Sequence, residues 1–173
     1  RPGLTLAVAG AALVGAVAAY GHRALDLPMQ QVGVHHVVEV PEGASFKETA
    51  RLLAQKGYDI YIATNQAGIA RGKVTREQVD GIHNRLTKEL KKAGVAIADI
   101  AICPHGWDEE CFCRKPNPGL FFDLSYKHHL NLFDSVCVGD DPRDIQAGKL
   151  AGCKTIYVGD MIYPDLYAVA QAL

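Results

Sequence analysis

The chain has 173 residues, of which 49% are hydrophobic and 21% are charged. This composition excludes a disordered chain, and the length suits one domain with a hydrophobic core. The net charge of −1, without any basic run, argues against a nucleic-acid partner, because nothing in the chain would attract phosphate backbones in bulk.

An apolar segment opens the chain. Leu4–Tyr20 contains Leu, Ala, Val, Gly and Thr residues and ends in a tyrosine, and its seventeen residues are at the lower limit for crossing a bilayer. A membrane anchor or uncleaved leader is one interpretation; a buried Gly/Ala-rich helix or strand, or a segment foreign to the domain, is another. We therefore set residues 1–36 apart as an apolar N-terminal segment, and expect one domain over residues 37–173.

From Val37 onward, strands and helices are predicted to alternate. Strands are expected at residues 37–40, 58–63, 98–103, 135–138 and 154–158. Helices are expected after N-terminal caps at Ser45, Thr75 and Asp141, and over residues 118–130 and 164–172. In the helix after Thr75, one apolar face is predicted to contain Val79, Ile82, Leu86 and Leu90. The alternation predicts an α/β fold, a doubly wound parallel sheet whose site lies at the C-terminal ends of the strands.

Four metal-ligand side chains follow the strand predicted at 98–103, within eleven residues: Cys103, His105, Cys111 and Cys113. Three thiolates and one imidazole match a closed, structural zinc site, which would order a loop that has few apolar residues. The alternative is a coincidental group of loop thiols. Zinc binding requires reduced thiolates, so the cluster indicates a reducing compartment.

Polar groups that suit a phosphoryl group occur at two places. Thr64, Asn65 and Gln66 directly follow the apolar strand at 58–63, where a hydroxyl and amides can donate hydrogen bonds, although an ordinary turn is equally consistent. Arg114 and Lys115 directly follow the cysteine loop. Two adjacent cations suit a dianionic phosphate, and a solvated basic pair is the alternative.

Carboxylates follow the strand at 135–138. Asp140 comes directly after the glycine that ends this strand, and hard oxygen ligands there suit Mg²⁺. We interpret Asp141 and Asp144 instead as caps of the next helix.

Three segments, taken in their order along the chain, resemble the haloacid-dehalogenase superfamily. They are Thr64-Asn65-Gln66, the run from Cys103 to Gly119, and Gly139-Asp140. Within the superfamily, the resemblance is to the zinc-loop phosphatases of the D-glycero-D-manno-heptose-1,7-bisphosphate and histidinol-phosphate type. It implies catalytic roles for Thr64, as the phosphate-binding hydroxyl, and for Lys115, which would neutralise charge. It also implies substrate contacts from Asn65, Gln66 and Arg114, a magnesium ligand at Asp140, and a zinc loop in place of a large cap. The expected partner is a small phosphorylated substrate, a sugar or polyol phosphate monoester.

The same phosphatases begin with a strand that ends in Asp-x-Asp-Gly, whose first aspartate attacks phosphorus. No Asp-x-Asp precedes Tyr58 in this chain, and Asp26, the nearest candidate, is followed by Leu27 and Pro28. Because covalent phosphoryl transfer needs a nucleophile, we expect impaired turnover. The alternative function is a non-catalytic phosphate-binding or scaffold module, either free or tethered to a membrane through Leu4–Tyr20.

Residues 1–57 are similar to the membrane-proximal start of endolytic murein transglycosylases, through Arg23–Pro28, Val38–Ser45 and Ala50–Gly57. The strand, turn and helix predicted there could equally precede the Thr64 strand of a phosphatase. Zinc–thiolate chemistry favours a cytoplasmic location, and the apolar segment favours the membrane-anchored alternative. We expect a monomer.

Overall fold

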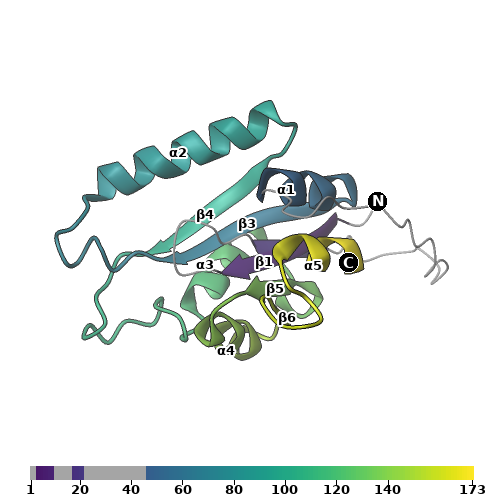
Figure 1. Cartoon of the computed structure of the whole chain (residues 1–173). Helices are drawn as coiled ribbons and strands as arrows, with labels where there is room; N and C mark the ends of the chain where they lie inside the picture. The colour runs from purple at the N-terminus through teal and green to yellow at the C-terminus, as the bar shows by residue number, and fades with distance from the viewer. Residues whose placement is uncertain (1–2, 10–16, 22–45) are drawn as a thin grey trace.

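The computed structural model describes residues 3–9, 17–21 and 46–173 (Figure 1). Among these residues the strands form one sheet in the order β4-β3-β1-β2-β5-β6. The strands are β1 (Gly3–Ala9), β2 (Val17–Gly21), β3 (Tyr58–Asn65), β4 (Ile97–Cys103), β5 (Val136–Gly139) and β6 (Lys154–Tyr157). The helices are α1 (Phe46–Gln55), α2 (Arg76–Lys92), α3 (Gly119–His128), the short 3₁₀ helix η1 (Leu132–Asp134), α4 (Pro142–Ala151) and α5 (Leu166–Ala172).

Helices cover both faces of the sheet. α1 and α5 lie side by side on one face, and α3 and α4 lie on the other (Figure 1). Each face has its own hydrophobic core, one around Leu53, Ile60 and Val169, the other around Ala63, Phe121 and Ala147. β1, β3, β4, β5 and β6 pair in parallel, and β2 pairs antiparallel with its neighbours. The predicted α/β fold with a largely parallel, doubly covered sheet is confirmed.

The described part of Leu4–Tyr20 consists of strands. β1 pairs with β3 and β5, with Ala9 opposite Gly139, and β2 returns antiparallel to β1. The described residues of this segment form strands and not one helix, because their backbone hydrogen bonds lie in the sheet, which agrees with the strand alternative. The membrane anchor itself stays a prediction. No helix in the described ranges is both long enough and apolar enough to span a bilayer. The strand predicted at 37–40 and the cap at Ser45 lie outside the described residues.

Helix α2 begins as predicted but is rotated from the predicted orientation. The Thr75 hydroxyl accepts a hydrogen bond from the Gln78 N–H at 3.2 Å, and the Gln78 carboxamide accepts one from the Thr75 N–H at 2.8 Å, which confirms the capping box. Val79 is buried, whereas Ile82 is 44% exposed and His83 is buried in its place. His83 lies one helical turn after Val79, so the sheet-facing stripe passes through the histidine rather than through the isoleucine.

Two other helix ends depart slightly from prediction. α3 ends at His128 because His129 adopts a left-handed conformation with φ of 55°. α5 begins at Leu166 because the Asp165 carboxylate caps it by accepting a hydrogen bond from the Ala168 N–H at 2.8 Å.

Candidate functional site

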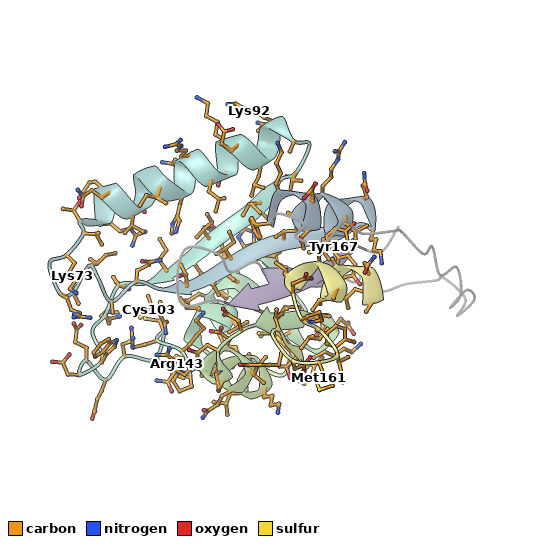
Figure 2. All side chains as sticks on the ribbon, in the orientation of Figure 1. Lys73, Lys92, Cys103, Arg143, Met161 and Tyr167 are labelled. Carbon is orange, nitrogen blue, oxygen red and sulfur yellow. The ribbon has the colours of Figure 1, made fainter. Side chains whose placement is uncertain are left out.

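A cavity of about 260 Å³ lies at the C-terminal ends of β3 and β5, beside the loop that follows β4. Cys103 and Arg143 mark this end of the molecule, away from Tyr167 (Figure 2). Four residues predicted from the sequence line the cavity: Asn65, Gln66, Arg114 and Lys115. The lining also includes Ala67, Gly68, Trp107, Asp141, Arg143 and Asp144. The sheet therefore brings together the segments predicted to bind phosphate.

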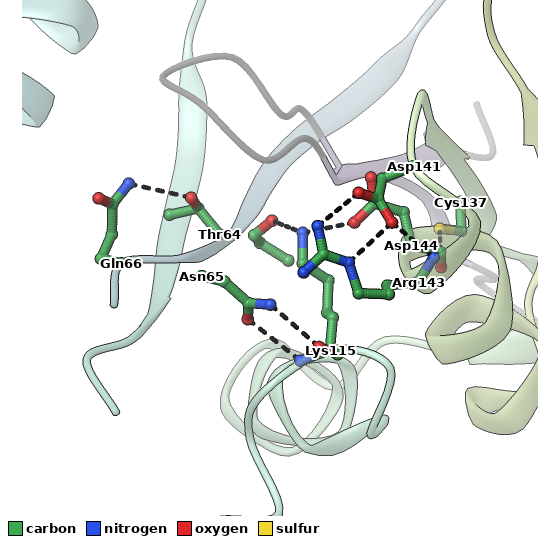
Figure 3. Close-up of polar contacts among 9 residues, drawn as sticks. Thr64, Asn65, Gln66, Lys115, Cys137, Asp141, Arg143 and Asp144 are labelled. Atoms are coloured by element: carbon green, nitrogen blue, oxygen red, sulfur yellow. Dashed lines mark hydrogen bonds and ion pairs between the residues drawn. The ribbon is translucent and has the colours of Figure 1, made fainter. Parts of the chain in front are cut away.

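A buried ion pair lies at the base of this site. Lys115 is 2% exposed, and its Nζ lies 2.8 Å from Asp144 Oδ1 and donates to the Ala63 carbonyl oxygen at 2.9 Å (Figure 3). Burial lowers the pKa of Lys115, and the Asp144 carboxylate opposes that shift. Burial likewise raises the pKa of Asp144. Our interpretation of Asp144 as a helix cap is wrong, because its carboxylate turns inward to the lysine.

Asn65 holds the backbone of Lys115 in place. Its Nδ2 donates to the Lys115 carbonyl oxygen at 3.1 Å, and its Oδ1 accepts from the Lys115 N–H at 3.1 Å (Figure 3). Both peptide groups of the lysine are thus bonded by one side chain from the end of β3. Beside it, Gln66 Nε2 donates to Thr64 Oγ1 at 3.1 Å. Thr64 is buried and is not among the residues that line the cavity.

The carboxylates after β5 occupy three different environments. Asp141 caps α4 as predicted, accepting from the Arg143 N–H at 2.8 Å, and the Arg143 side chain lowers its pKa to about 2. Asp140 is exposed and does not line the cavity. Asp144 Oδ2 is buried and has no hydrogen-bond partner among the described residues. Such an orphaned carboxylate oxygen, near a second carboxylate, fits the oxygen ligands that Mg²⁺ prefers.

The sulfur and nitrogen atoms of the cysteine–histidine loop already stand at the spacing of a tetrahedral zinc site. Around zinc, two sulfur ligands lie about 3.8 Å apart, and a sulfur and a nitrogen lie about 3.6 Å apart. The S–S distances here are 3.6 Å (Cys103–Cys111) and 3.7 Å (Cys111–Cys113), and the Sγ–Nδ1 distances from His105 are 3.6 Å to Cys103 and 3.2 Å to Cys113. The four ligand atoms all lie within 4.8 Å of one another, so the cluster could hold a metal ion.

Burial raises the pKa of Cys103 and of Cys113. Thiolates are therefore disfavoured at these two positions unless a cation compensates their charge, as a bound divalent metal would.

Polar contacts connect the metal-ligand cluster to the cavity. Arg114 Nη1 donates to the His105 carbonyl oxygen at 3.1 Å, and Asn117 Nδ2 donates to the Cys111 carbonyl oxygen at 2.9 Å. The loop thus fixes the arginine that directly precedes Lys115.

Besides Asp144, whose inward orientation was not predicted, Arg143 and Trp107 are the charged and aromatic side chains of the cavity that were not expected from the sequence. Arg143 is three residues beyond Asp140, and its proximity to the predicted magnesium position was the available signal. Trp107 is the single tryptophan of the chain and stands between two predicted zinc ligands, which was a signal we did not use.

Comparisons with known proteins agree on one family. The HAD-hydrolase-like family model matches residues 112–165. The D-glycero-beta-D-manno-heptose-1,7-bisphosphate 7-phosphatase of Bordetella bronchiseptica is 35% identical over 145 residues, covering 75% of this chain and 80% of that protein. The D-glycero-alpha-D-manno-heptose-1,7-bisphosphate 7-phosphatase of Photorhabdus laumondii is 42% identical over 124 residues, covering 68% of each chain.

Solved structures point the same way. The D,D-heptose 1,7-bisphosphate phosphatase of B. bronchiseptica, complexed with magnesium and phosphate, superposes with a TM-score of 0.68 at 32% identity, covering 73% of this chain and 79% of that one. A putative HAD-like phosphatase from Mesorhizobium loti superposes with a TM-score of 0.55 at 30% identity, covering 65% of this chain and 56% of that one.

Proposed function

Because the chain belongs to the haloacid-dehalogenase-like phosphatases, we propose that its cavity binds the phosphoryl group of a small sugar phosphate for Mg²⁺-dependent monoester hydrolysis. The proposed substrate is a heptose 1,7-bisphosphate, which the names of the relatives specify. Histidinol phosphate, the other substrate that the sequence resemblance implies, is the competing candidate.

The buried Lys115–Asp144 pair carries this proposal. A cation that is 2% exposed, and whose position is set by a carboxylate and a carbonyl oxygen, is already oriented before a ligand binds. Such preorganised charge is worth most where negative charge develops during reaction. Arg114, Asn65 and Gln66 are proposed to contact the phosphate oxygens, since all three line the cavity with Lys115. Thr64, whose hydroxyl accepts from Gln66, is proposed to complete the site.

Asp140 and Asp144 would hold the magnesium ion. The exposed carboxylate of Asp140 follows β5, and Asp144 contributes the buried oxygen that has no partner among the described residues. Bound there, Mg²⁺ would neutralise charge on the phosphoryl oxygens. The four residues of the cysteine–histidine cluster are proposed to bind one structural zinc ion, since no further ligand is required for a closed site.

Turnover is proposed to be low in this chain. β1 ends at Ala9, beside the glycine that precedes Asp140, and the next three residues are Gly10, Ala11 and Ala12. None of them can attack phosphorus, and loss of a nucleophile together with its acid–base partner costs many orders of magnitude in rate. The same observation supports the second candidate function, binding of a phosphate ligand without hydrolysis.

Two chains assayed side by side test these proposals: the natural sequence and a variant carrying Ala9→Asp, Ala11→Asp and Ala12→Gly. Release of inorganic phosphate from heptose 1,7-bisphosphate and from p-nitrophenyl phosphate is measured with and without Mg²⁺, and calorimetry measures inorganic phosphate binding. We expect phosphate binding by both chains and Mg²⁺-dependent turnover that rises in the variant. Turnover by the natural chain at the rate of an intact phosphatase would refute the missing-nucleophile argument. Failure of both chains to bind phosphate would refute the site itself.

A further inference from the structure

Trp107 stands at the border of two cavities. Its side chain is 71% exposed, yet it lines both the cavity of about 260 Å³ and an adjoining cavity of about 370 Å³. The two cavities share only Trp107, Arg114, Lys115 and Arg143. The second is completed by residues of the metal-ligand loop and its exit: Glu109, Glu110, Cys111, Pro116 and Asn117. The indole therefore borders the space beyond the buried lysine.

One side chain covers a face of this exposed ring, and hydrogen bonds order the two backbone segments that carry the pair. The Gly106 N–H, directly before it, donates to Glu109 Oε1 at 3.0 Å, which closes the turn that carries the tryptophan. The guanidinium of Arg71 lies over the ring, with Cζ 4.8 Å from the ring centroid, a distance at which a cation is attracted to the π face. Arg71 is itself attached to the loop through its neighbour, because the Ala70 N–H donates to the Pro104 carbonyl oxygen at 3.2 Å.

A restrained indole that remains exposed beside a polar cavity suits one class of ligand. A sugar ring presents C–H groups on its faces and hydroxyl groups at its rim, so one face can pack against an aromatic ring while the hydroxyls stay hydrated. An acyclic phosphate ester has no such face, and inorganic phosphate has no C–H groups that could pack against the indole. The neighbouring Phe112 is also exposed, at 63%, but it stacks on Phe122 at 6.0 Å and lines neither cavity.

We propose that Trp107, held in place by Arg71, is a specificity-determining residue that binds the ring of a cyclic sugar phosphate and so selects it over acyclic phosphate esters. This inference rests on the proposed function, because the phosphate of the same ligand must occupy the cavity with Lys115.

The tryptophan supplies its own readout, since the chain has one tryptophan and its fluorescence reports this position alone. The whole chain is titrated with mannose 6-phosphate, glycerol 3-phosphate and inorganic phosphate while acrylamide quenching of the fluorescence is followed. We expect mannose 6-phosphate to protect the indole from acrylamide and the other two to leave quenching unchanged. Arg71→Gln should increase quenching in the free protein, because the ring loses the group that covers one face.

Calorimetry on variants supplies the affinities. Trp107→Ala should weaken mannose 6-phosphate binding by about 3- to 10-fold, the range expected for one aromatic packing contact, and leave inorganic phosphate binding within about twofold. Trp107→Phe should retain part of the preference, and the matched control Phe112→Ala should retain all of it. Metal content and thermal midpoint are measured for each variant, so that a disordered loop is recognised.

Two results overturn the inference, and they differ from failure of the proposed function. If inorganic phosphate binds but Trp107→Ala leaves the affinity for mannose 6-phosphate unchanged, or lowers the affinity for all three ligands equally, the tryptophan does not select the ring. If the natural chain binds none of the three ligands, the phosphate site itself is wrong, and the inference falls with it.

Discussion

Replacing Lys115 with methionine tests the electrostatic centre of the site. Methionine has a similar length but no charge, so the variant removes the cation that lies 2.8 Å from Asp144 and the donor to the Ala63 carbonyl oxygen. The carboxylate is then left buried without its partner. We expect both weaker phosphate binding and a less stable fold.

The magnitude follows from burial on both sides of the pair. Lys115 and Asp144 are each about 2% exposed, and breaking a buried pair by removing one partner costs about 3–5 kcal/mol. For a chain of 173 residues this corresponds to a fall of about 6–20 °C in the thermal midpoint. By contrast, Lys92→Met breaks the exposed Lys92–Glu89 pair and should leave the midpoint unchanged.

The deficit should also depend on pH. Burial raises the pKa of Asp144 even with the lysine present. In the Lys115→Met variant the folded state therefore retains a proton on Asp144, whereas the unfolded chain releases it above about pH 3.9. The folded variant then binds more protons than the unfolded one, so its stability rises as pH falls through the raised pKa and is lowest near neutral pH.

Chemical denaturation of the natural chain, Lys115→Met, Asp144→Asn and the double variant, at pH 5 and pH 7, measures this coupling. We expect the double variant to be more stable than Lys115→Met alone, because no charge remains buried. If Lys115→Met matches the natural chain in stability at pH 7, or the double variant gains nothing over it, the pair is not the buried charge pair that we describe.

Three further changes give separate tests. Cys111→Ser should lower the bound zinc from about one ion per chain and lower the thermal midpoint, whereas Cys153→Ser, outside the cluster, should keep the metal; equal zinc content in both variants would contradict a structural zinc site. Gly119→Ala should destabilise the fold by about 1–3 kcal/mol, because its Cβ would lie 2.5 Å from the Phe112 carbonyl oxygen. Gly81→Ala, in helix α2, should instead stabilise it by about 0.5–1 kcal/mol, because no atom lies within 4 Å of the new Cβ. A similar effect of both substitutions in chemical denaturation would refute the steric argument. Arg143→Ala should raise the pKa of Asp141 from about 2 toward 3.8, as measured by NMR titration of its carboxyl carbon. The stabilisation that this carboxylate contributes is present above its unfolded pKa and lost as pH falls toward 2, and in the variant it should disappear. An unchanged titration midpoint of Asp141 would show that the arginine is not its partner.

Local signals were sufficient where one short segment determines the outcome. The capping box at Thr75 and Gln78 involves neighbouring residues, and so does the placement of Cys103, His105, Cys111 and Cys113 in a single loop. The alternation of strands and helices predicted the sheet for the same reason, because each apolar strand is one continuous stretch of sequence.

Features that depend on the packing of distant segments were beyond local reasoning. Asp144 looks like a cap in sequence, and its true partner is Lys115, twenty-nine positions earlier, where the metal-ligand loop ends. His83 replaces Ile82 on the buried stripe of α2 because the sheet sets the rotation of the helix. β1 and β2 read as one apolar segment, and only pairing with β3 and β5 separates them. The similarity of residues 1–57 to murein transglycosylases stays a prediction.

Both ends of the metal-ligand loop are attached to the same point of the sheet. At its start, Cys103 is opposite Asn65 in the parallel register of β3 and β4, and the Cys103 carbonyl oxygen accepts from the Gln66 N–H at 2.7 Å. At its end, the Asn65 side chain forms two hydrogen bonds with the backbone of Lys115. A loop that leaves and re-enters at one place can change in length or composition at its tip without shifting the frame around it. Substitutions within residues 106–110 are therefore expected to alter the tip of the loop without displacing Lys115 at its base.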